Sequence, residues 1–317
     1  MIRRSRDMTN KPLGMFTNRF FTRRVAISAM LAAGIGTSLA MSGCNSMGPK
    51  LHQHRSMQIP HLAGTAVSVT SANGWIEAIQ VDRGDVGLEV ELYGRDLERL
   101  NFATVHADRM GDQTLRVWVE WPGGKRQNGE GATISLELPD AADIKVNSSN
   151  GHITIAGLSG HAELRTSNGS IRIDRHDGSV FADTSNGRLQ AEHVSGEIEM
   201  YSSNGKVIII DAFGPIRAET SNGKVYISTM DGNPGPIRVR SSNGRIDLDL
   251  GDGFEGILKC QTSNGKLILS DLGGATLIES SKKMIEIGFG DSDEVSAVKT
   301  SNGSVRVRGR HTEPADG

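Results

Sequence analysis

The sequence predicts an all-β protein: a parallel β-solenoid of about nine coils of 18–21 residues, preceded by a β-rich N-terminal cap. Three observations predict this fold class. The tripeptide Ser-Asn-Gly occurs eight times at a nearly constant spacing, apolar and polar residues alternate on both sides of each copy, and glycine is abundant (39 of 317 residues) while aromatic residues are scarce (4%). Such a short period is typical of solenoids, because a single unit cannot bury its apolar face without a stacked neighbour.

The repeat sets the length and the path of each coil. Successive asparagines of the tripeptide are separated by 18, 18, 18, 18, 21, 21 and 38 residues, and the last interval contains a degenerate unit with Lys282 and Lys283 in place of Asn and Gly. Apolar residues stand four positions before the asparagine and three and five positions after it, as Leu164 and Ile171 do around Asn168. This period of two predicts strand, turn, strand in every coil.

The Asn-Gly bend is expected to be a structural ladder rather than a binding surface. Glycine can adopt a positive φ at the bend, because it has no Cβ to clash. Stacked asparagines about 4.8 Å apart can bond amide to amide along the stack. The Thr or Ser two residues earlier is expected to form a second, hydroxyl ladder. The ladder asparagines are Asn150, Asn168, Asn186, Asn204, Asn222, Asn243, Asn264 and Asn302.

Bulk composition excludes several classes of protein. Lys and Arg total 35 against 37 Asp and Glu, a formal charge of −2, which argues against a dedicated nucleic-acid binder. The two cysteines, Cys44 and Cys260, are too few for a disulfide framework or a cysteine-rich metal site. Cys260 falls in an inward row and is expected to be a buried, inert thiol. The nine histidines share no position in the repeat, so we expect neither a metal nor a cofactor.

Residues 1–44 have the pattern of an export signal. Seven basic residues and one acid precede an uncharged run over residues 25–40, and the sequence then reads Leu-Ala-Met-Ser-Gly-Cys. We expect Cys44 to be acylated, which makes the chain a membrane-anchored lipoprotein on the periplasmic, outer-membrane or cell-surface side. The alternative is an uncleaved membrane anchor, because residues 25–49 are uncharged and long enough to span a bilayer. Residues 45–62 are expected to be a short tether.

Residues 63–140 lack the repeat and are expected to cap the first coil. Alternation predicts three strands, over residues 86–93, 115–121 and 132–138. One helical turn is expected over residues 96–100. One echo of the repeat, Ser-Ala-Asn-Gly, ends at Gly74. The three tryptophans, Trp75, Trp118 and Trp121, are expected to pack in the core of the cap rather than to stack on sugars. The repeats then occupy residues 141–310, and a disordered tail is expected over residues 311–317.

One pair of carboxylates supports an alternative in which the protein is an enzyme. Parallel β-helix folds include polysaccharide lyases and hydrolases, whose chemistry needs carboxylates that converge on one face. Asp174 and Glu192 each stand six residues after a repeat asparagine and are 18 residues apart, so stacking would place them side by side. Two adjacent carboxylates raise the pKa of one of them, which suits a general acid. The sequence implies no cleft around them, and we expect a non-enzymatic protein.

One outward row is strongly basic. Lys or Arg stands two residues after the asparagine in five consecutive repeats: Arg188, Lys206, Lys224, Arg245 and Lys266. Like charges stacked at strand spacing repel each other unless acids or a ligand compensate them. One interpretation is a solubilising face that discourages lateral sheet pairing. The other is a linear anion-binding stripe for acidic polysaccharide or lipid head groups.

The export signal, the segments VSVTSANGWIEA and LRVWVEW, and the iterated TSNGKV resemble the bacterial putative adhesin family, domain of unknown function 4097. The resemblance covers residues from about 65 to 310 and implies a β-solenoid surface domain, a link with envelope stress and no catalytic residues. We therefore expect a lipid-anchored, non-enzymatic surface module, structural or adhesin-like. Its expected partners are the membrane and either envelope polysaccharide or another surface protein. The alternatives are a β-helical carbohydrate-active enzyme and an envelope scaffold that self-assembles through uncapped ends.

Overall fold

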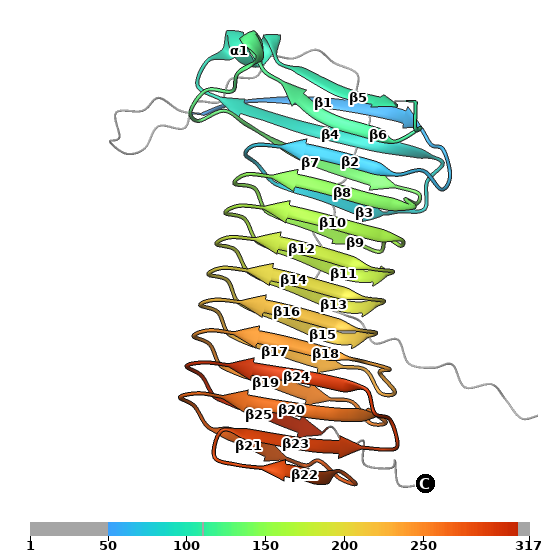
Figure 1. Ribbon diagram of the computed structural model, residues 1–317. Helices are drawn as coiled ribbons and strands as arrows, with labels where there is room; N and C mark the ends of the chain where they lie inside the picture. The colour runs from blue at the N-terminus through green and yellow to red at the C-terminus, as the bar shows by residue number, and fades with distance from the viewer. Residues whose placement is uncertain (1–49, 110, 310–317) are drawn as a thin grey trace, which may run out of the picture. The chain divides into compact units, whose positions relative to one another are not determined.

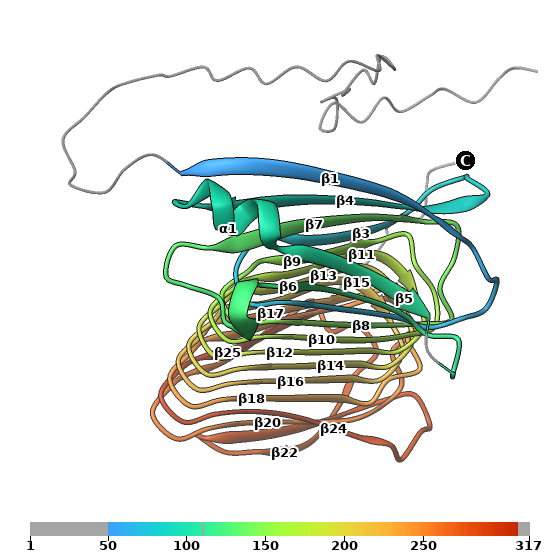
Figure 2. The ribbon, with the colours of Figure 1, turned by 90° about the horizontal axis from the view of Figure 1, so that it is seen from above.

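The computed structural model describes residues 50–109 and 111–309, all of which lie within one compact unit, residues 47–317. Two long β-sheets face each other across one apolar core (Figure 1). Each coil contributes one strand to each sheet, so a coil has two faces (Figure 2). The predicted all-β, parallel solenoid is therefore confirmed. The expected export signal, residues 1–44, lies outside the described residues.

Sheet A has twelve strands, which are in spatial order β1 (Leu51–Pro60), β4 (Asp85–Gly94), β7 (Gly131–Leu138), β3 (Ile76–Gln80), β9 (Ile153–Ala156), β11 (Ile171–Asp177), β13 (Leu189–Ser195), β15 (Val207–Phe213), β17 (Val225–Thr229), β19 (Ile246–Leu250), β25 (Val305–Gly309) and β21 (Leu267–Ser270). Sheet B has thirteen strands, which are in the opposite spatial order β22 (Thr276–Ser280), β23 (Met284–Phe289), β20 (Gly256–Thr262), β24 (Val295–Thr300), β18 (Ile237–Ser241), β16 (Ile216–Thr220), β14 (Ile198–Ser202), β12 (Val180–Thr184), β10 (His161–Thr166), β8 (Asp143–Ser148), β2 (Val67–Ser71), β6 (Leu115–Glu120) and β5 (Thr104–Arg109). The described residues also contain one short α-helix, α1 (Leu97–Phe102), and one 3₁₀ turn, η1 (Pro122–Gly124).

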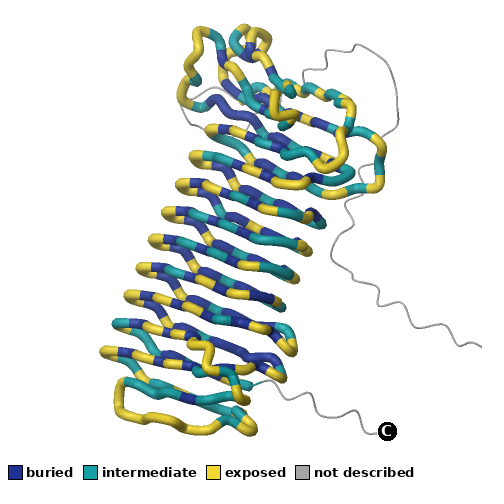
Figure 3. The backbone as a smooth tube through the Cα atoms, turned by 45° about the vertical axis from the view of Figure 1, so that its right-hand side comes forward, coloured by how far each residue is buried: buried dark blue, intermediate teal, exposed yellow. Residues whose placement is uncertain are grey.

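Neighbouring coils pair residue for residue, so like positions of the repeat lie over one another. Ile171 pairs with Leu189, which pairs with Val207, and all three are at most 1% exposed. Figure 3 shows the resulting alternation of buried and accessible residues along each coil. Each buried aliphatic side chain contributes about 1.5–3 kcal/mol. A slip of one residue would turn the whole row outward, so burial of these rows fixes the register.

The last coil in the sequence is not the last coil in space. β24 pairs with both β18 and β20, and β25 pairs with both β19 and β21. The coil β24–β25 is therefore inserted between coil β18–β19 and coil β20–β21. The chain leaves one coil position open when it forms β20, and returns later to fill that position. Sequence order alone predicts the opposite arrangement, with β20–β21 directly beneath β18–β19.

The degenerate repeat does not form a coil with one strand in each sheet. Residues around Lys282 and Lys283 instead connect β22 to β23; β23 runs antiparallel both to β22 and to β20. The equivalent bend of the neighbouring coil has Gly265, where a Cβ would lie only 1.8 Å from the carbonyl oxygen of Gly303. A lysine cannot occupy such a position. As a result Ile278, which the repeat predicts to point inward, is 53% exposed.

At the N-terminal end both sheets change from parallel to antiparallel pairing. β7 pairs parallel with β3 but antiparallel with β4, and β6 pairs parallel with β2 but antiparallel with β5. The strands expected in the cap correspond to β4, β6 and β7. The expected helical turn is α1, where the Asp96 carboxylate accepts from the backbone N–H groups of Glu98 and Arg99. Contrary to expectation, β2 and β3 belong to a complete coil, which lies between β6–β7 and β8–β9.

The expected tether over residues 45–62 is wrong for its larger part. Residues 51–60 form β1, an edge strand of sheet A that pairs antiparallel with β4 along its whole length. The more buried positions of β1 alternate with exposed ones, but Gln53 and Arg55 occupy two of them. Because these two residues are polar, the apolar alternation typical of a strand is weak in the sequence. The segment forms a strand because the edge of β4 offers unpaired backbone groups to bond with. Residues 45–49 lie outside the described residues.

Candidate functional site

The Ser-Asn-Gly bends form one continuous edge of the stack, which we call the turn edge. At each bend the chain passes from a strand of sheet B to a strand of sheet A. From Asn150 onward, the Nδ2 group of each asparagine donates to the Oδ1 atom of its neighbour on the side of the N-terminal end of the stack, at 2.8–2.9 Å. In spatial order this ladder contains Asn73, Asn150, Asn168, Asn186, Asn204, Asn222, Asn243, Asn302 and Asn264. Asn73, in the echo of the repeat, is the rung at the N-terminal end of the ladder.

The hydroxyl two residues before the asparagine does not bond to another hydroxyl. Thr184 Oγ1 accepts from the N–H of Gly187 in its own coil at 3.2 Å, and donates to the carbonyl oxygen of Gly169 in the neighbouring coil at 3.0 Å. Thr166 and Ser202 form the same pair of bonds. The expected hydroxyl ladder is therefore wrong. These buried hydroxyls instead bridge the backbones of adjacent coils, where unpaired groups would be costly.

Glycine is required at the bend because two backbones approach closely, not because of a left-handed conformation. A Cβ on Gly205 would lie 1.6 Å from the carbonyl oxygen of Gly187, and a Cβ on Gly169 would lie 1.8 Å from that of Gly151. Of the turn-edge glycines in the described residues, Gly74 is the one with a positive φ, at 113°. The positive φ expected at the other bends is therefore wrong. Positive φ occurs instead at the second bend of the coils, at Gly160, Gly178, Gly196 and Gly214.

The residues two positions after each asparagine form one row along the turn edge. Backbone hydrogen bonds between coils give its spatial order as Trp75, His152, Ser170, Arg188, Lys206, Lys224, Arg245, Ser304 and Lys266. The first four predicted cations therefore lie in four adjacent coils. Ser304 separates Lys266 from Arg245, because the coil β24–β25 is inserted between their coils. The expectation of five consecutive cationic coils is wrong for that reason.

Three of these cations carry charge that no acid among the described residues compensates. Arg188, Lys206 and Lys224 are all exposed, and none of them forms an ion pair within the described part of the chain. Arg245 differs, because its Nε–H donates to the carboxylate of Asp247 at 2.8 Å. Like charges at a spacing of about 4.8 Å repel each other. We call Arg188, Lys206 and Lys224 the cation row; the asparagine ladder holds their backbones in fixed positions.

An exposed tryptophan lies on the same edge. Trp75 is 49% exposed, and its Nε1–H donates to Thr154 Oγ1 in the next coil at 3.3 Å. The expected packing in the core of the cap holds for Trp121, which is 8% exposed. It is wrong for Trp118, which is half-buried on the outward side of β6, where its ring stacks on that of His106 at 4.6 Å. It is wrong for Trp75, because the position two residues after the asparagine points outward in every coil.

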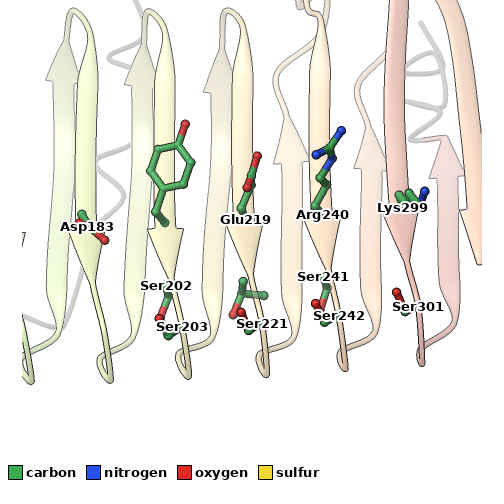
Figure 4. A pocket seen from close by; sticks show the side chains of 12 residues that line it. Asp183, Ser202, Ser203, Glu219, Ser221, Arg240, Ser241, Ser242, Lys299 and Ser301 are labelled. Atoms are coloured by element: carbon green, nitrogen blue, oxygen red, sulfur yellow. The ribbon is translucent and has the colours of Figure 1, made fainter.

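A shallow groove of about 450 Å³ lies beside the turn edge, on the outer face of sheet B (Figure 4). Its margin at the turn edge contains the serines of four repeats: Ser203, Ser221, Ser242 and Ser301. Its outer-face residues come from five adjacent strands: Asp183, Tyr201, Glu219, Arg240 and Lys299. The groove therefore crosses β12, β14, β16, β18 and β24, and Lys299 reaches it through the inserted coil.

Charge changes along this groove. At one end the hydroxyl of Tyr201 donates to Glu199 at 2.6 Å. Burial, together with that carboxylate, raises the pKa of Tyr201 to about 12, so the phenol stays protonated at neutral pH. At the other end Arg240 and Lys299 are neighbours and both are exposed, and neither forms an ion pair with another described residue. That end of the groove is suited to an anionic group.

Sequence reasoning did not single out Tyr201, Arg240 or Lys299. All three stand three residues before a repeat asparagine, and that shared position was the available signal. Amide, acidic, aromatic and basic residues all occur at this position along the chain, so no single chemistry recurs there. The two basic residues become neighbours only because β24 lies beside β18.

The two carboxylates considered for catalysis are neighbours on the outer face of sheet A, and each is held by a cation. Asp174 pairs in register with Glu192. The guanidinium of Arg175 lies 3.1 Å from Asp174, and that of Arg172 lies 2.9 Å from Glu192. The imidazole of His193 lies 3.6 Å from Asp174. Neither carboxylate lines the groove on sheet B. Their arrangement is that of a surface ion-pair network.

Among the described residues, neither the cysteine nor the candidate metal ligands form a reactive centre. Cys44, the expected lipid attachment site, lies outside the described residues. Cys260 is fully buried, and burial raises the pKa of its thiol to about 12, which keeps it protonated. The described residues contain no cluster of three or more His, Cys, Asp or Glu side chains arranged to hold a metal ion. Among those same residues, no helix has the length and apolar character needed to span a membrane.

Comparison with known proteins identifies one family. A model of the Toastrack DUF4097 family matches residues 110–308. Similar solved structures include a putative adhesin from Parabacteroides distasonis, which is 10% identical over 80% of this chain and 97% of that chain, with a TM-score of 0.38. A putative adhesin from Bacteroides fragilis is 14% identical over 82% of this chain and 97% of that chain, with a TM-score of 0.32. A putative lipid binding protein from Parabacteroides distasonis is 11% identical over 82% of this chain and 97% of that chain, with a TM-score of 0.29. No functionally curated protein matches the chain.

Proposed function

The chain belongs to the Toastrack DUF4097 family, and we propose that it is an exported, non-enzymatic binding module that holds an acidic polysaccharide of the cell envelope along its turn edge. The observation that carries this proposal is the cation row. Arg188, Lys206 and Lys224 lie in three adjacent coils, exposed and without a compensating acid among the described residues. In this proposal acylation of Cys44 anchors the module to the membrane, and the polysaccharide is its partner.

A polymer with regularly spaced negative charges fits the cation row better than a small anion does. The three cations repel one another in the unbound protein, and a polyanion lying along the row would relieve that repulsion. The coils already hold the row in position, so binding orders little more than the ends of three side chains. A basic residue facing an anionic surface contributes about 1 kcal/mol. Three such contacts correspond to roughly a hundredfold in affinity.

Aromatic and hydroxyl groups on the same edge favour a sugar polymer over other polyanions. Trp75 presents an exposed indole on the same row as the cations. Such a ring combines a flat apolar face with a polar rim and so suits the face of a sugar ring. The exposed serines Ser203, Ser221 and Ser242 offer hydroxyls that both donate and accept beside the row. The link with envelope stress stays a prediction from the family resemblance.

The proposal predicts salt-sensitive binding that depends on the cation row. Polygalacturonate, an acidic polysaccharide, should bind the full chain at low ionic strength, whereas neutral dextran should not. The triple variant Arg188→Gln, Lys206→Gln, Lys224→Gln should lose roughly a hundredfold in affinity and much of the dependence on salt, because each cation releases a counterion on binding. Titration calorimetry at two salt concentrations measures both quantities.

A matched control places the same charge change elsewhere. Lys125→Gln, Lys282→Gln, Arg306→Gln removes three cations outside the cation row and should leave affinity within about twofold. An equal loss of affinity in the two triple variants, or unchanged affinity in the first, would refute the proposal.

Trp75→Ala should weaken binding of polygalacturonate but not of poly-glutamate, which has no sugar rings. Shortening of polygalacturonate by the wild-type chain that disappears with Asp174→Asn would contradict the non-enzymatic part.

A further inference from the structure

At the C-terminal end of the stack, sheet B extends two strands further than sheet A. β21 is the last strand of sheet A and belongs to the same coil as β20, whereas sheet B continues from β20 to β23 and then β22. Among the described residues β21 pairs only with β25, and β22 pairs only with β23. This end is therefore a step with two open strand edges, one in each sheet.

Apolar side chains are exposed at this step. Ile268 of β21 is 37% exposed, and Leu277 and Ile278 of β22 are 60% and 53% exposed. All five residues of β22 are exposed, and Figure 3 shows a continuous exposed stretch at this end of the stack. Leu277 pairs with Ile287, which is 3% exposed and faces the core. Leu277 therefore points toward the side of sheet A, but sheet A has no described strand opposite it.

We propose that a second copy of the chain occupies this step and forms a closed twofold dimer, joined end to end. The directions of the strands permit this arrangement. β22 runs antiparallel to β23, which runs antiparallel to β20, so β22 has the direction of β20. β21 returns from β20 through the bend at Asn264 and has the opposite direction. A twofold axis parallel to the strands exchanges the two sheets and keeps each direction, so the partner's β22 meets β21 antiparallel.

The side chains support the same pairing. With Leu269 opposite the partner's Leu277, Ile268 lies opposite the partner's Ile278, and the two apolar pairs cover the exposed Ile268, Leu277 and Ile278. Lys266 then lies close to the partner's Glu279, giving opposite charges across the interface. In the single chain neither Lys266 nor Glu279 forms an ion pair with another described residue. The twofold axis repeats each of these contacts, so both open edges are paired and both sheets continue from one copy into the other.

The chain's own C-terminal segment is poorly suited to the same position. Residues 310–317 read Arg-His-Thr-Glu-Pro-Ala-Asp-Gly and contain no large apolar side chain. Pro314 also lacks the N–H group that strand pairing needs. The segment follows β25, which is already paired on both sides by β19 and β21. A second copy supplies what this segment lacks: a strand with exposed Leu277 and Ile278. This inference is independent of the proposed function.

Sedimentation velocity of the full-length chain tests the inference, with Cys44→Ser in every sample so that acylation cannot cause association. We expect twice the monomer mass at micromolar concentration. Ile278→Glu should raise the dimer dissociation constant at least about tenfold, because the partner edge would then bury a charge. Phe213→Glu, at a 40% exposed apolar residue away from the step, is the matched control and should leave the dimer unchanged. Circular dichroism shows whether each variant is folded.

A charge exchange gives a second, independent readout. Lys266→Glu should weaken the dimer by like-charge repulsion, and Glu279→Lys in the same chain should restore it. A monomeric wild-type chain overturns the inference, and so does a folded Ile278→Glu variant that dimerises as tightly as wild type. Deletion of residues 310–317 that converts a monomer into a dimer also overturns it, because that result would assign the step to the chain's own C-terminal segment.

Discussion

Replacement of Gly205 by alanine is expected to destabilise the stack by more than about 3 kcal/mol, a large fraction of the stability of an ordinary domain. The new Cβ would lie 1.6 Å from the carbonyl oxygen of Gly187. A clash with a side chain can be relieved by rotation, but this clash is with backbone. The N–H of Asn204 donates to the carbonyl oxygen of Ser185 in the same neighbouring coil at 2.9 Å, so the two backbones cannot separate without losing such bonds. Urea unfolding followed by circular dichroism measures the effect.

Gly84→Ala is the matched control for this substitution. Gly84 is exposed, has no positive φ, and a Cβ there would meet no heavy atom within 4 Å. We expect a change below about 0.5 kcal/mol. Equal stability losses for the two variants, or a Gly205→Ala chain as stable as wild type, would contradict the close backbone stacking at the turn edge.

Deletion of residues 291–317 is expected to release the whole region from residue 252 to residue 290, not only the coil that is removed. β24 and β25 separate coil β18–β19 from coil β20–β21 and pair with both. Without them β20 keeps only its antiparallel partner β23, and β21 has no described partner strand. Residues 252–290 should therefore become accessible to protease, whereas residues 143–250 should stay protected. Limited proteolysis with mass spectrometry distinguishes the two regions.

A shorter deletion provides the comparison. Removal of residues 310–317 alone leaves all described strands intact and should not change the cleavage pattern. A chain without residues 291–317 that still protects residues 252–290 would show that β20–β21 packs directly on β18–β19. That result would contradict the inserted coil, and with it the position of Ser304 between Arg245 and Lys266.

The strands and bends of each coil are predictable from the sequence because the same pattern occurs in every repeat. Alternation around the asparagines predicts the two strands of each coil, and the inward rows such as Ile171, Leu189 and Val207 are buried as the alternation requires. The order of the coils is not predictable in this way. Residues 264 and 302 lie in equivalent repeats, and nothing in either repeat says which one is the nearer neighbour of Asn243. Nonlocal pairing of whole coils decides that order.

The candidate site is only partly predictable for the same reason. The residues of the cation row recur at one position of the repeat, so Arg188, Lys206 and Lys224 can be read from the sequence. The exclusion of Lys266 depends on the inserted coil and needs the structure. Trp75 shows the opposite error, because tryptophan is usually assigned to a core, whereas here its position after Asn73 places it on the turn edge. For Trp75, the place in the repeat decided the exposure, and the chemical type of the residue did not.

Binding of an acidic polysaccharide along the turn edge is tested most directly by measuring which lysines polygalacturonate covers. Acetylation of surface lysines by acetic anhydride, quantified by mass spectrometry with and without the polymer, reports each lysine separately. If the polymer lies along the cation row, Lys206 and Lys224 should be protected while Lys125 and Lys282 react at unchanged rates. Protection of Lys125 and Lys282 with no change at Lys206 and Lys224 would contradict binding at the turn edge.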